Sequence, residues 1–352
     1  MNDKVMVALS GGVDSSVATA LLIQQGYSVC AGTLNLCPND NGTADSARLA
    51  AESLGVEHYV FDYRSDFRTE VIDRFAKAYL DGLTPNPCVE CNKAIKFPKL
   101  LKEAKALGCD YIATGHYVKK EYDSASGRWL IKNAEDEGKD QTYVLYVLTQ
   151  DILKRTLFPM GDITKDEARR IAAELKLASA HKKDSQDICF ISNGDYAGFI
   201  ENNLGLKSKS GSFIYKDGSV LGKNKGVLHY TIGQRKGLGI SYAHPIYVTD
   251  KSASSGDVFL GENEDLFTNR LYAKNVNFIA VEKLTSPMRV KAKARYSQKA
   301  AEATVFPISD DEIMVEFDSP QRAVTPGQSV VMYVGDYVLG GGVIITPKGG
   351  AE

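Results

Sequence analysis

The chain has 352 residues and a mass of 38.4 kDa, which predicts two or three domains at about 150 residues each. Its 42 basic and 44 acidic residues leave a net charge of −2, which argues against a globally basic nucleic-acid coat but allows a local basic patch. Mean hydropathy is −0.22, no apolar run approaches the roughly 20 residues of a membrane span, and the start lacks a signal-peptide pattern. We therefore expect a cytoplasmic protein without membrane contact.

The first half of the chain alternates short apolar runs with segments of helical spacing. Strands are expected at 4–9, 29–34, 57–61 and 110–114, and helices at 14–25, 44–54, 66–79, 93–107 and 165–175. Alternation of this kind is typical of α/β proteins. It predicts a doubly wound parallel sheet with helices on both faces.

Beyond residue 200 the helical periodicity fades, and short strands separated by Gly and Asp turns replace it. A hairpin is expected at 213–221, and further strands at 258–261, 272–283, 288–296, 303–306, 313–317, 329–334 and 337–345. Strands of this length and spacing indicate small barrels or sandwiches. We expect an α/β domain at 1–200, a central small β domain at 201–269 and a C-terminal β-barrel at 270–352.

A glycine-rich loop, SGGVDSS at 10–16, separates the first predicted strand from its helix. Glycines let the backbone approach a ligand closely, and the N–H groups at the helix start form a site for an anion such as phosphate. Asp14 in such a loop fits a magnesium partner or a helix cap. The loop is not a Walker A motif, because no Lys-Ser or Lys-Thr follows the glycines. The alternative interpretation is a plain glycine-rich turn.

Cys88 and Cys91 are close enough in sequence to indicate redox, metal or catalytic use. Two flanking prolines are expected to hold the backbone extended through Pro87, so that the next helix begins at Lys93 with Asn92 as its cap. A thiolate at Cys91 would then be stabilised by the helix N-terminus, with help from the neighbouring lysines 93 and 96.

Three interpretations of these cysteines remain open. Cys88 and Cys91 are half of a zinc site, or a redox dithiol, or one of them pairs with the distant Cys189 in sulfur transfer. The second pair of ligands that a zinc site needs is missing from the sequence, and the prolines do not resemble a thioredoxin active site. The remaining cysteines are expected to be small buried hydrophobic residues, namely Cys30, Cys37 and Cys109.

A basic strand is expected at 288–296, where four charged residues alternate with small apolar ones. Period two places Arg289, Lys291, Lys293 and Arg295 on one face. Such a face suits a phosphate backbone, and each contact adds salt dependence to the binding. An ordinary solvated sheet face is the alternative.

Longer blocks of the sequence then resemble a known family almost end to end. With these blocks, the chain is similar to the bacterial tRNA-specific 2-thiouridylases, which belong to the PP-loop ATP pyrophosphatase superfamily. The blocks are ALSGGVDSS at 8–16, TPNPCVECNKAIKF at 84–97, ATGHY at 113–117, KDQTYVLYVL at 139–148, LFPMG at 157–161, KKDSQDICFI at 182–191, HYTIGQRKGLGI at 229–240, FDSPQRAVTPGQSVVMY at 317–333 and LGGGVI at 339–344.

The resemblance implies an ATP site and two catalytic cysteines in the first domain. ATP, with Mg²⁺, activates O2 of the wobble uridine by adenylation and releases pyrophosphate. A partner sulfurtransferase delivers sulfur as a persulfide on Cys189. That sulfur attacks C2, AMP departs, and Cys91 resolves the persulfide to leave a Cys91–Cys189 disulfide. The implied ATP-binding residues are Ala8, Leu9, Ser10, Gly11, Gly12, Val13, Asp14, Ser15, Leu34 and Gly115.

The resemblance also implies contacts with tRNA. The segment Asn86, Pro87 and Cys88 would form a rigid wall beside the target base, which must leave its stack to react. The other implied tRNA contacts are His116, Lys139, Asp140, Gln141, Arg295, Tyr296 and Gln328. For His116 the alternative is a helix cap or supporting hydrogen bonder, and for 139–141 it is a solvated helix start. We expect a monomer that receives sulfur from a cysteine desulfurase or a sulfur relay protein.

Three further hypotheses are kept. Cys88, Cys91 and Cys189 would ligate three irons of a [4Fe–4S] cluster, which then replaces the persulfide. A PP-loop ligase acting on a small molecule would leave the cysteines and the basic strand without a purpose. A nonenzymatic RNA-binding protein would not need the glycine-rich loop.

Overall fold

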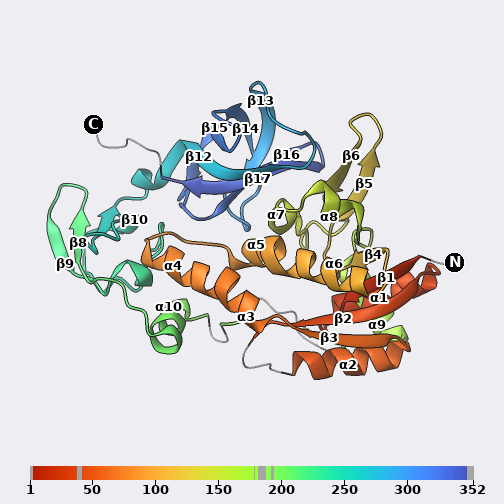
Figure 1. Ribbon diagram of the computed structural model, residues 1–352. Helices are drawn as coiled ribbons and strands as arrows, with labels where there is room; N and C mark the ends of the chain where they lie inside the picture. The colour runs from red at the N-terminus through yellow and green to blue at the C-terminus, as the bar shows by residue number, and fades with distance from the viewer. Residues whose placement is uncertain (1–2, 38–41, 178, 181–187, 192–193, 347–352) are drawn as a thin grey trace.

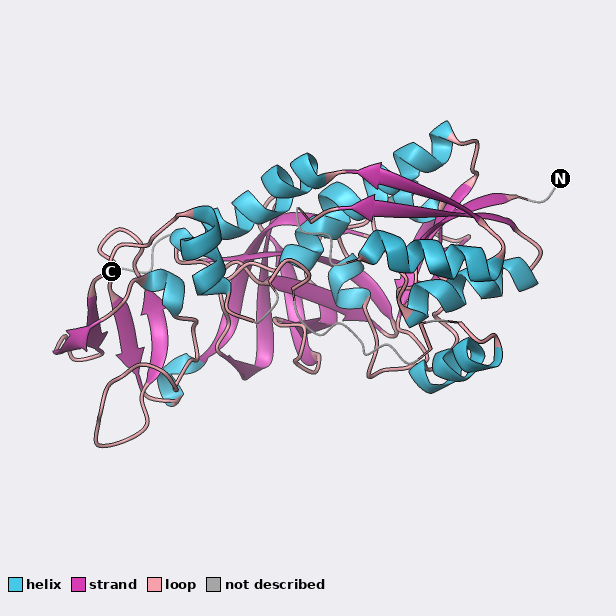
Figure 2. Ribbon diagram, turned by 90° about the horizontal axis from the view of Figure 1, so that it is seen from below, coloured by secondary structure: helices cyan, strands magenta, loops and turns pink. Residues whose placement is uncertain are grey.

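The computed structural model describes residues 3–37, 42–177, 179–180, 188–191 and 194–346. A parallel sheet with its helices forms one end of the elongated molecule, and a small sheet with short helices forms the other (Figures 1 and 2). A closed barrel lies over the long helices between them (Figure 1). Within these residues, every helix is too short or too polar to cross a membrane.

The parallel sheet has the strand order β3-β2-β1-β4-β7, which confirms the doubly wound α/β prediction. Side chains of the central strand alternate between its two faces. Val5 and Val7 pack with Leu22 of α1 on one face, while Met6 packs with Leu100 of α6 on the other. The strands are β1 (Lys4–Ala8), β2 (Ser28–Asn35), β3 (Glu57–Asp62), β4 (Tyr111–Ala113) and β7 (Thr156–Leu157).

Helices cover both faces of this sheet, as predicted. On one side α1 packs against α9 through Val17, Ala168 and Ala172. The helices outside the two long runs described next are α1 (Val13–Gln24), α2 (Thr43–Leu54), α7 (Thr142–Leu145), α8 (Gln150–Lys154) and α9 (Lys165–Glu174).

Two long helical runs lie beneath the barrel, and each contains a π-helical turn. The first comprises α3 (Arg64–Phe67), η1 (Arg68–Asp73) and α4 (Arg74–Leu80). The second comprises α5 (Pro87–Cys91), η2 (Asn92–Lys96) and α6 (Phe97–Ala106).

The second run begins at Pro87, so the prediction of an extended segment ending at Lys93 was wrong. Proline is well suited to the first helical position, where its missing N–H would have had no helical partner. The Asn86 side chain caps the helix by accepting a hydrogen bond from Cys88 N at 3.1 Å. Asn92, the expected cap, lies inside the run and donates from Nδ2 to Val144 O at 2.9 Å.

The central part of the chain forms a four-stranded sheet of order β10-β11-β8-β9. Its predicted hairpin turns at Gly218, whose φ of +87° requires glycine. Strand β10 was not predicted. The elements are α10 (Tyr196–Gly198), η3 (Phe199–Asn203), β8 (Ser212–Tyr215), β9 (Val220–Lys223), η4 (Val227–His229), β10 (Tyr247–Lys251), β11 (Val258–Gly261) and η5 (Glu264–Leu266).

Six antiparallel strands form the C-terminal barrel, which closes where β12 pairs with β17. A hairpin from the first part of the chain, β5 (Lys119–Asp123) and β6 (Arg128–Lys132), extends this sheet through the pair Tyr337–Lys132. The barrel strands are β12 (Phe267–Phe278), β13 (Met288–Lys293), β14 (Ala301–Pro307), β15 (Glu312–Arg322), β16 (Ser329–Val334) and β17 (Tyr337–Ile345).

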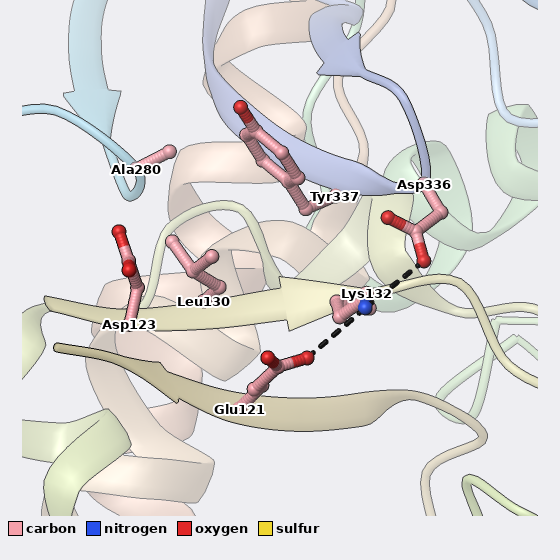
Figure 3. A pocket seen from close by; sticks show the side chains of 7 residues that line it. All are labelled: Glu121, Asp123, Leu130, Lys132, Ala280, Asp336 and Tyr337. Atoms are coloured by element: carbon pink, nitrogen blue, oxygen red, sulfur yellow. Dashed lines mark hydrogen bonds and ion pairs between the residues drawn. The ribbon is translucent and has the colours of Figure 1, made fainter. Parts of the chain in front are cut away.

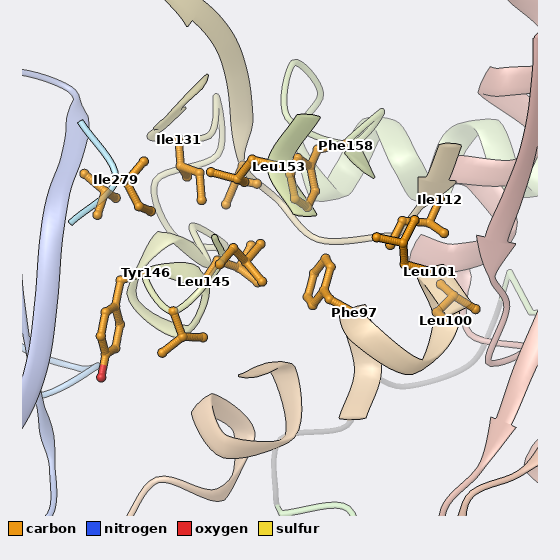
Figure 4. Packing of buried hydrophobic residues seen from close by; sticks show 14 of the residues in the cluster. Phe97, Leu100, Leu101, Ile112, Ile131, Leu145, Tyr146, Leu153, Phe158 and Ile279 are labelled. Carbon is orange, nitrogen blue, oxygen red and sulfur yellow. The ribbon is translucent and has the colours of Figure 1, made fainter. Parts of the chain in front are cut away.

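The largest hydrophobic core is shared between the parallel-sheet part and the barrel (Figure 4). Phe97 and Leu100 of α6, Leu145 and Tyr146 around α7, and Ile279 after β12 all belong to it. Tyr146 also shares a hydrogen bond of 3.1 Å with Ser329 Oγ at the start of β16. The two parts are therefore held in one fixed arrangement.

A polar cavity of about 310 Å³ lies where the hairpin meets the barrel (Figure 3). Lys132 spans it, with Nζ 3.0 Å from Glu121 Oε2 and 3.1 Å from Asp336 Oδ2. None of the residues expected at the active site lines this cavity, which is bounded by Glu121, Asp123, Leu130, Lys132, Ala280, Asp336 and Tyr337.

Candidate active site

The glycine-rich loop connects β1 to α1 at the carboxyl edge of the parallel sheet. Ser15 Oγ accepts from Ser10 N at 3.2 Å and donates to Gly12 O at 3.2 Å, which closes the loop on itself. Gly12 stands at the N-cap position of α1 and supplies no capping side chain. The first N–H groups of this twelve-residue helix therefore face the loop, where an anion is stabilised by the helix dipole.

Two glycines allow the loop to pack tightly against its surroundings. Gly11 has φ +68°, and a Cβ there would stand 2.5 Å from the backbone carbon of Ser46 in α2. Gly115 follows β4, and its Cβ would stand 2.8 Å from the backbone of both Asp14 and Ser15. The structure thus brings Gly115 directly against the loop to which the sequence assigned it.

An ion pair that the sequence analysis missed fixes the acidic residue of the loop. Asp14 Oδ1 accepts hydrogen bonds from Lys165 Nζ at 2.7 Å and from the Tyr117 hydroxyl at 2.7 Å. The Lys165 side chain is only 8% exposed. Lysine at the first position of helix α9 is unfavourable next to the helix dipole, and this was the signal available in the sequence.

The thiols of Cys88, Cys91 and Cys189 gather at one place although Cys189 is far away in the sequence. Each of the first two interacts electrostatically with Cys189, and Lys96 acts on all three. Cys88 and Cys189 are exposed, whereas Cys91 is buried at the end of α5. The expected meeting of the CxxC segment with the third cysteine is therefore present.

The thiolate expected at Cys91 is not favoured in this structure. Burial raises the pKa of Cys91 to about 11, and this outweighs the lowering by Lys96. Cys91 is the last residue of α5 rather than the first of a helix, so it lies away from the positive end of the dipole. The lysines expected to assist Cys189, at 182 and 183, lie outside the described residues.

The other cysteines divide into two kinds. Cys30 and Cys109 are buried as predicted, with their sulfur atoms 3.6 Å apart. Cys37 was expected to be a buried hydrophobic residue, but it is half-buried and its thiol lies in hydrogen-bonding contact with the thiol of Cys189. Sequence spacing gave no sign of this contact, because it joins two segments that are far apart in the chain and meet only through tertiary packing.

The iron–sulfur hypothesis requires three cysteine sulfurs that converge on one cluster. Among the residues that the structure describes, no three Cys, His, Asp or Glu side chains converge closely enough to hold a metal ion. The thiols as placed do not fit such a group.

His116 follows β4 at the carboxyl edge of the sheet, and its side chain is buried. Its ring stacks on Phe97 with centroids 5.6 Å apart, and Nδ1 shares a hydrogen bond of 2.8 Å with Thr114 Oγ1. Burial, followed by the charge of Lys96, holds the pKa of His116 well below its usual value. The imidazole is therefore neutral at physiological pH.

Several residues expected to contact tRNA meet at the junction with the barrel. The Asp140 carboxylate accepts hydrogen bonds from the backbone N–H groups of Ala134 and Thr142, at 2.9 and 3.1 Å. The Tyr296 hydroxyl donates to Asp140 O at 3.3 Å, and its side chain remains 47% exposed. Asp140 is therefore an internal support of the loop, whereas Tyr296 offers an accessible ring. The tRNA contacts expected at 139–141 stay a prediction.

Two further contacts tie the cysteine segment to this junction. Tyr296 interacts electrostatically with Cys88 as well as with Asp140. Gln328, just before β16, donates from Nε2 to Thr84 O at 2.8 Å. Candidate base-contacting and tRNA-contacting residues from both ends of the chain thus line one surface.

The basic strand has the predicted one-sided character, but its charges are largely paired. Arg289 forms a bidentate ion pair with Asp318 at 2.8 Å, and Glu302 lies 3.6 Å from Lys291. Strand β13 ends at Lys293, so the predicted extension to Tyr296 was wrong. These pairs correspond to the alternative of an ordinary solvated face for Arg289.

Arg295 lies beyond the strand and links the central part of the chain to the barrel. Its Nη2 is 3.1 Å from Ile232 O and 2.7 Å from Ala323 O, and it also contacts Thr325 Oγ1. Burial lowers the pKa of this guanidinium. The tRNA contact expected at Arg295 stays a prediction, while the structure shows an anchor between two parts of the fold.

Replacing Arg295 with alanine is expected to lower the free energy of unfolding by about 2 kcal/mol, because two backbone carbonyls lose a charged donor. Arg289→Ala is the matched control, since its exposed pair should contribute less than about 1 kcal/mol. Urea unfolding of both variants measures the difference. Equal losses in the two variants would contradict the anchoring role.

Comparison with known proteins covers the whole chain. Family models match three successive segments: a tRNA methyl transferase HUP domain at 3–193, a tRNA methyl transferase PRC-barrel domain at 197–262 and an aminomethyltransferase beta-barrel domain at 268–344. Curated relatives match over nearly their full length. The tRNA-specific 2-thiouridylase MnmA of Clostridioides difficile is 48% identical, covering 98% of each chain.

Two more relatives carry the same name. The protein of Clostridium acetobutylicum is 49% identical over 98% of this chain and 100% of its own, and that of Acetivibrio thermocellus is 47% identical over 97% and 99%. Identity at this level over the entire length extends beyond the motifs around the loop and the cysteines. The chain therefore belongs to the family of tRNA-specific 2-thiouridylases.

Proposed function

We propose that the protein is an ATP-dependent tRNA sulfurtransferase that converts the wobble uridine of tRNA to 2-thiouridine. The observation that carries this proposal is the position of Leu34 at the end of β2. Its side chain packs against the core cluster that Ala8, the last residue of β1, also contacts, and against the cluster that contains Cys91 and that Cys37 also contacts. This position of Leu34 supports phosphate binding on one side of its side chain and thiol chemistry on the other.

ATP is assigned to the loop and to the N-terminus of α1. The free N–H groups of the helix face the phosphates, and Gly115 lets strand β4 approach the loop without a side chain between them. Asp14 is already paired with Lys165 and Tyr117, so it does not suit direct ligation of Mg²⁺. The ion would enter bound to the ATP phosphates.

The reaction uses two successive activations. Transfer of AMP to O2 of the uridine releases pyrophosphate and turns that oxygen into a leaving group. A persulfide on Cys189, supplied by a sulfur-donor protein, then attacks C2, and AMP departs with the former O2. Exposure of Cys189 suits sulfur delivery by another protein. The nearby Cys91 thiol then attacks Cys189 Sγ, which breaks its bond to the transferred sulfur, leaves that sulfur on C2 and forms a Cys91–Cys189 disulfide.

The accessible ring of Tyr296 and the cysteine segment beside it are assigned to the tRNA. A flipped uridine requires stacking and a rigid wall, which Tyr296 and the capped turn Asn86–Pro87 supply. We assign Lys139 and Gln328 to the RNA backbone beside this surface.

The test is incubation of the protein with ATP, magnesium, an unmodified tRNA transcript and a persulfide source. We expect 2-thiouridine by mass spectrometry, with one AMP and one pyrophosphate released per base modified. A transcript that carries cytidine at the wobble position is the matched control and should yield none. ATP cleavage without 2-thiouridine in the uridine transcript would contradict the proposal.

A further inference from the structure

Cys37 and Cys189 bring two thiols together outside the CxxC segment. Cys37 follows the end of β2 and is half-buried, and Cys189 is exposed. The two thiols lie in hydrogen-bonding contact. Phe190 fixes the position of Cys189 by packing edge-on against Phe67 and Phe75, with ring centroids 5.8 and 5.4 Å apart.

Cys91 is placed less favourably for reaction with Cys189. It lies within an apolar cluster beside Phe67 and Ile95 and is 8% exposed, whereas Cys37 packs at the rim of that cluster. Cys91 interacts with Cys189 electrostatically, but the hydrogen bond of Cys189 goes to Cys37. Cys37 is thus the thiol in direct contact with the proposed sulfur carrier.

We propose that Cys37 is a second disulfide partner of Cys189 and that Cys37, rather than Cys91, closes the disulfide when the reduced enzyme is oxidised. The resulting Cys37–Cys189 bond stores the sulfur-carrying thiol in a protected form. Reduction of this bond by a cellular dithiol would return both thiols, with the reductant oxidised to its own disulfide.

Two routes lead to this bond, and both balance. A peroxide oxidises the Cys189 thiol to a sulfenic acid and leaves water; the Cys37 thiol then displaces a second water to form the disulfide. Alternatively, the Cys37 thiolate attacks the inner sulfur of a Cys189 persulfide, which forms the disulfide and expels hydrosulfide. Only the second route rests on the proposed function, because it needs the persulfide.

The hydrogen bond between the two thiols has a further effect on Cys189. It is the largest cause of a raised pKa at Cys189, ahead of burial. A thiol held protonated reacts slowly with electrophiles, since the thiolate is the nucleophile. Cys37 would therefore lower the reactivity of the Cys189 thiol before oxidation and form the disulfide with Cys189 after it.

The experiment maps disulfides in the full-length protein, reduced and then treated with dilute hydrogen peroxide in the absence of ATP and tRNA. Digestion under non-reducing conditions and mass spectrometry should show the Cys37–Cys189 peptide pair as the main cross-link to Cys189. The cross-link should persist in Cys91→Ser and be lost in Cys37→Ser. A second sample treated with glutathione persulfide should give the same pair.

A dominant Cys91–Cys189 pair, or the absence of any Cys37–Cys189 pair in wild-type protein, would overturn the proposal. The wild-type map needs no variant, so poor folding of a mutant does not obscure it. The peroxide arm requires no tRNA chemistry. Its failure is therefore distinct from failure to form 2-thiouridine.

Discussion

Replacing Cys189 with serine is expected to reduce 2-thiouridine formation to the level of a reaction without enzyme. A serine hydroxyl cannot carry a sulfane sulfur, so no nucleophile remains to attack the activated base. ATP-dependent pyrophosphate release with tRNA should continue, because the glycine-rich loop is held by Ser10, Gly12 and Ser15 and not by this thiol. The Cys189→Ser variant would thereby lose sulfur transfer while it keeps adenylation.

The matched control is Cys109→Ser, which changes a buried thiol beside Cys30 on the parallel sheet. Both products are measured in the same reactions, 2-thiouridine by mass spectrometry and pyrophosphate by an enzyme-coupled assay. Persistent 2-thiouridine in Cys189→Ser would remove Cys189 from the sulfur pathway. Loss of pyrophosphate release as well would show that this segment also supports adenylation.

Replacing Lys165 with methionine is the second change with a large expected effect. Methionine keeps much of the volume but removes the cation 2.7 Å from Asp14 Oδ1. Asp14 is 35% exposed, so the loss of stability should be roughly 2 kcal/mol, between the values for surface and fully buried ion pairs. The unpaired carboxylate then faces the ATP phosphates, and we expect the KM for ATP to rise about tenfold, which corresponds to 1.4 kcal/mol.

A double variant distinguishes charge from packing at this ion pair. Lys165→Met combined with Asp14→Asn removes both charges, so it should recover part of the stability and of the ATP affinity lost in the single variant. Lys102→Met, on a side chain 72% exposed, is the surface control. Urea unfolding and ATP titration of pyrophosphate release measure both effects. A double variant as impaired as the sum of its singles would contradict the charge argument.

Elements set by local sequence were predictable, whereas those set by distant partners were not. The strand–loop–helix at β1 and α1 follows from an apolar run, two glycines and a helical repeat, all within 4–25. The hairpin β5–β6 was missed, because its strands are short and charged and its sheet partner Tyr337 lies far along the chain. Pro87 was misread because the same ring that breaks a helix interior is favoured at its first position.

The candidate site divides in the same way. The loop, Gly115 and the meeting of Cys91 with Cys189 were expected from motifs. Lys165 and Cys37 were not, since an ion pair across 151 residues and a thiol contact between separate segments depend on tertiary packing. The buried state of Cys91 likewise follows from the aromatic side chains around it rather than from its own helix.

The close fit of Tyr146 against the barrel bears on how this protein can change over evolutionary time. A Cβ at Gly341 would stand 2.7 Å from the Tyr146 ring, so strand β17 accepts the ring only where it carries glycine. A barrel taken from a distant homologue would need a glycine at the position of Gly341, because any larger residue there would clash with the Tyr146 ring of this chain. Recombination between the parallel-sheet part and the barrel would separate Tyr146 from Gly341. We therefore expect these two parts of the protein to be inherited together.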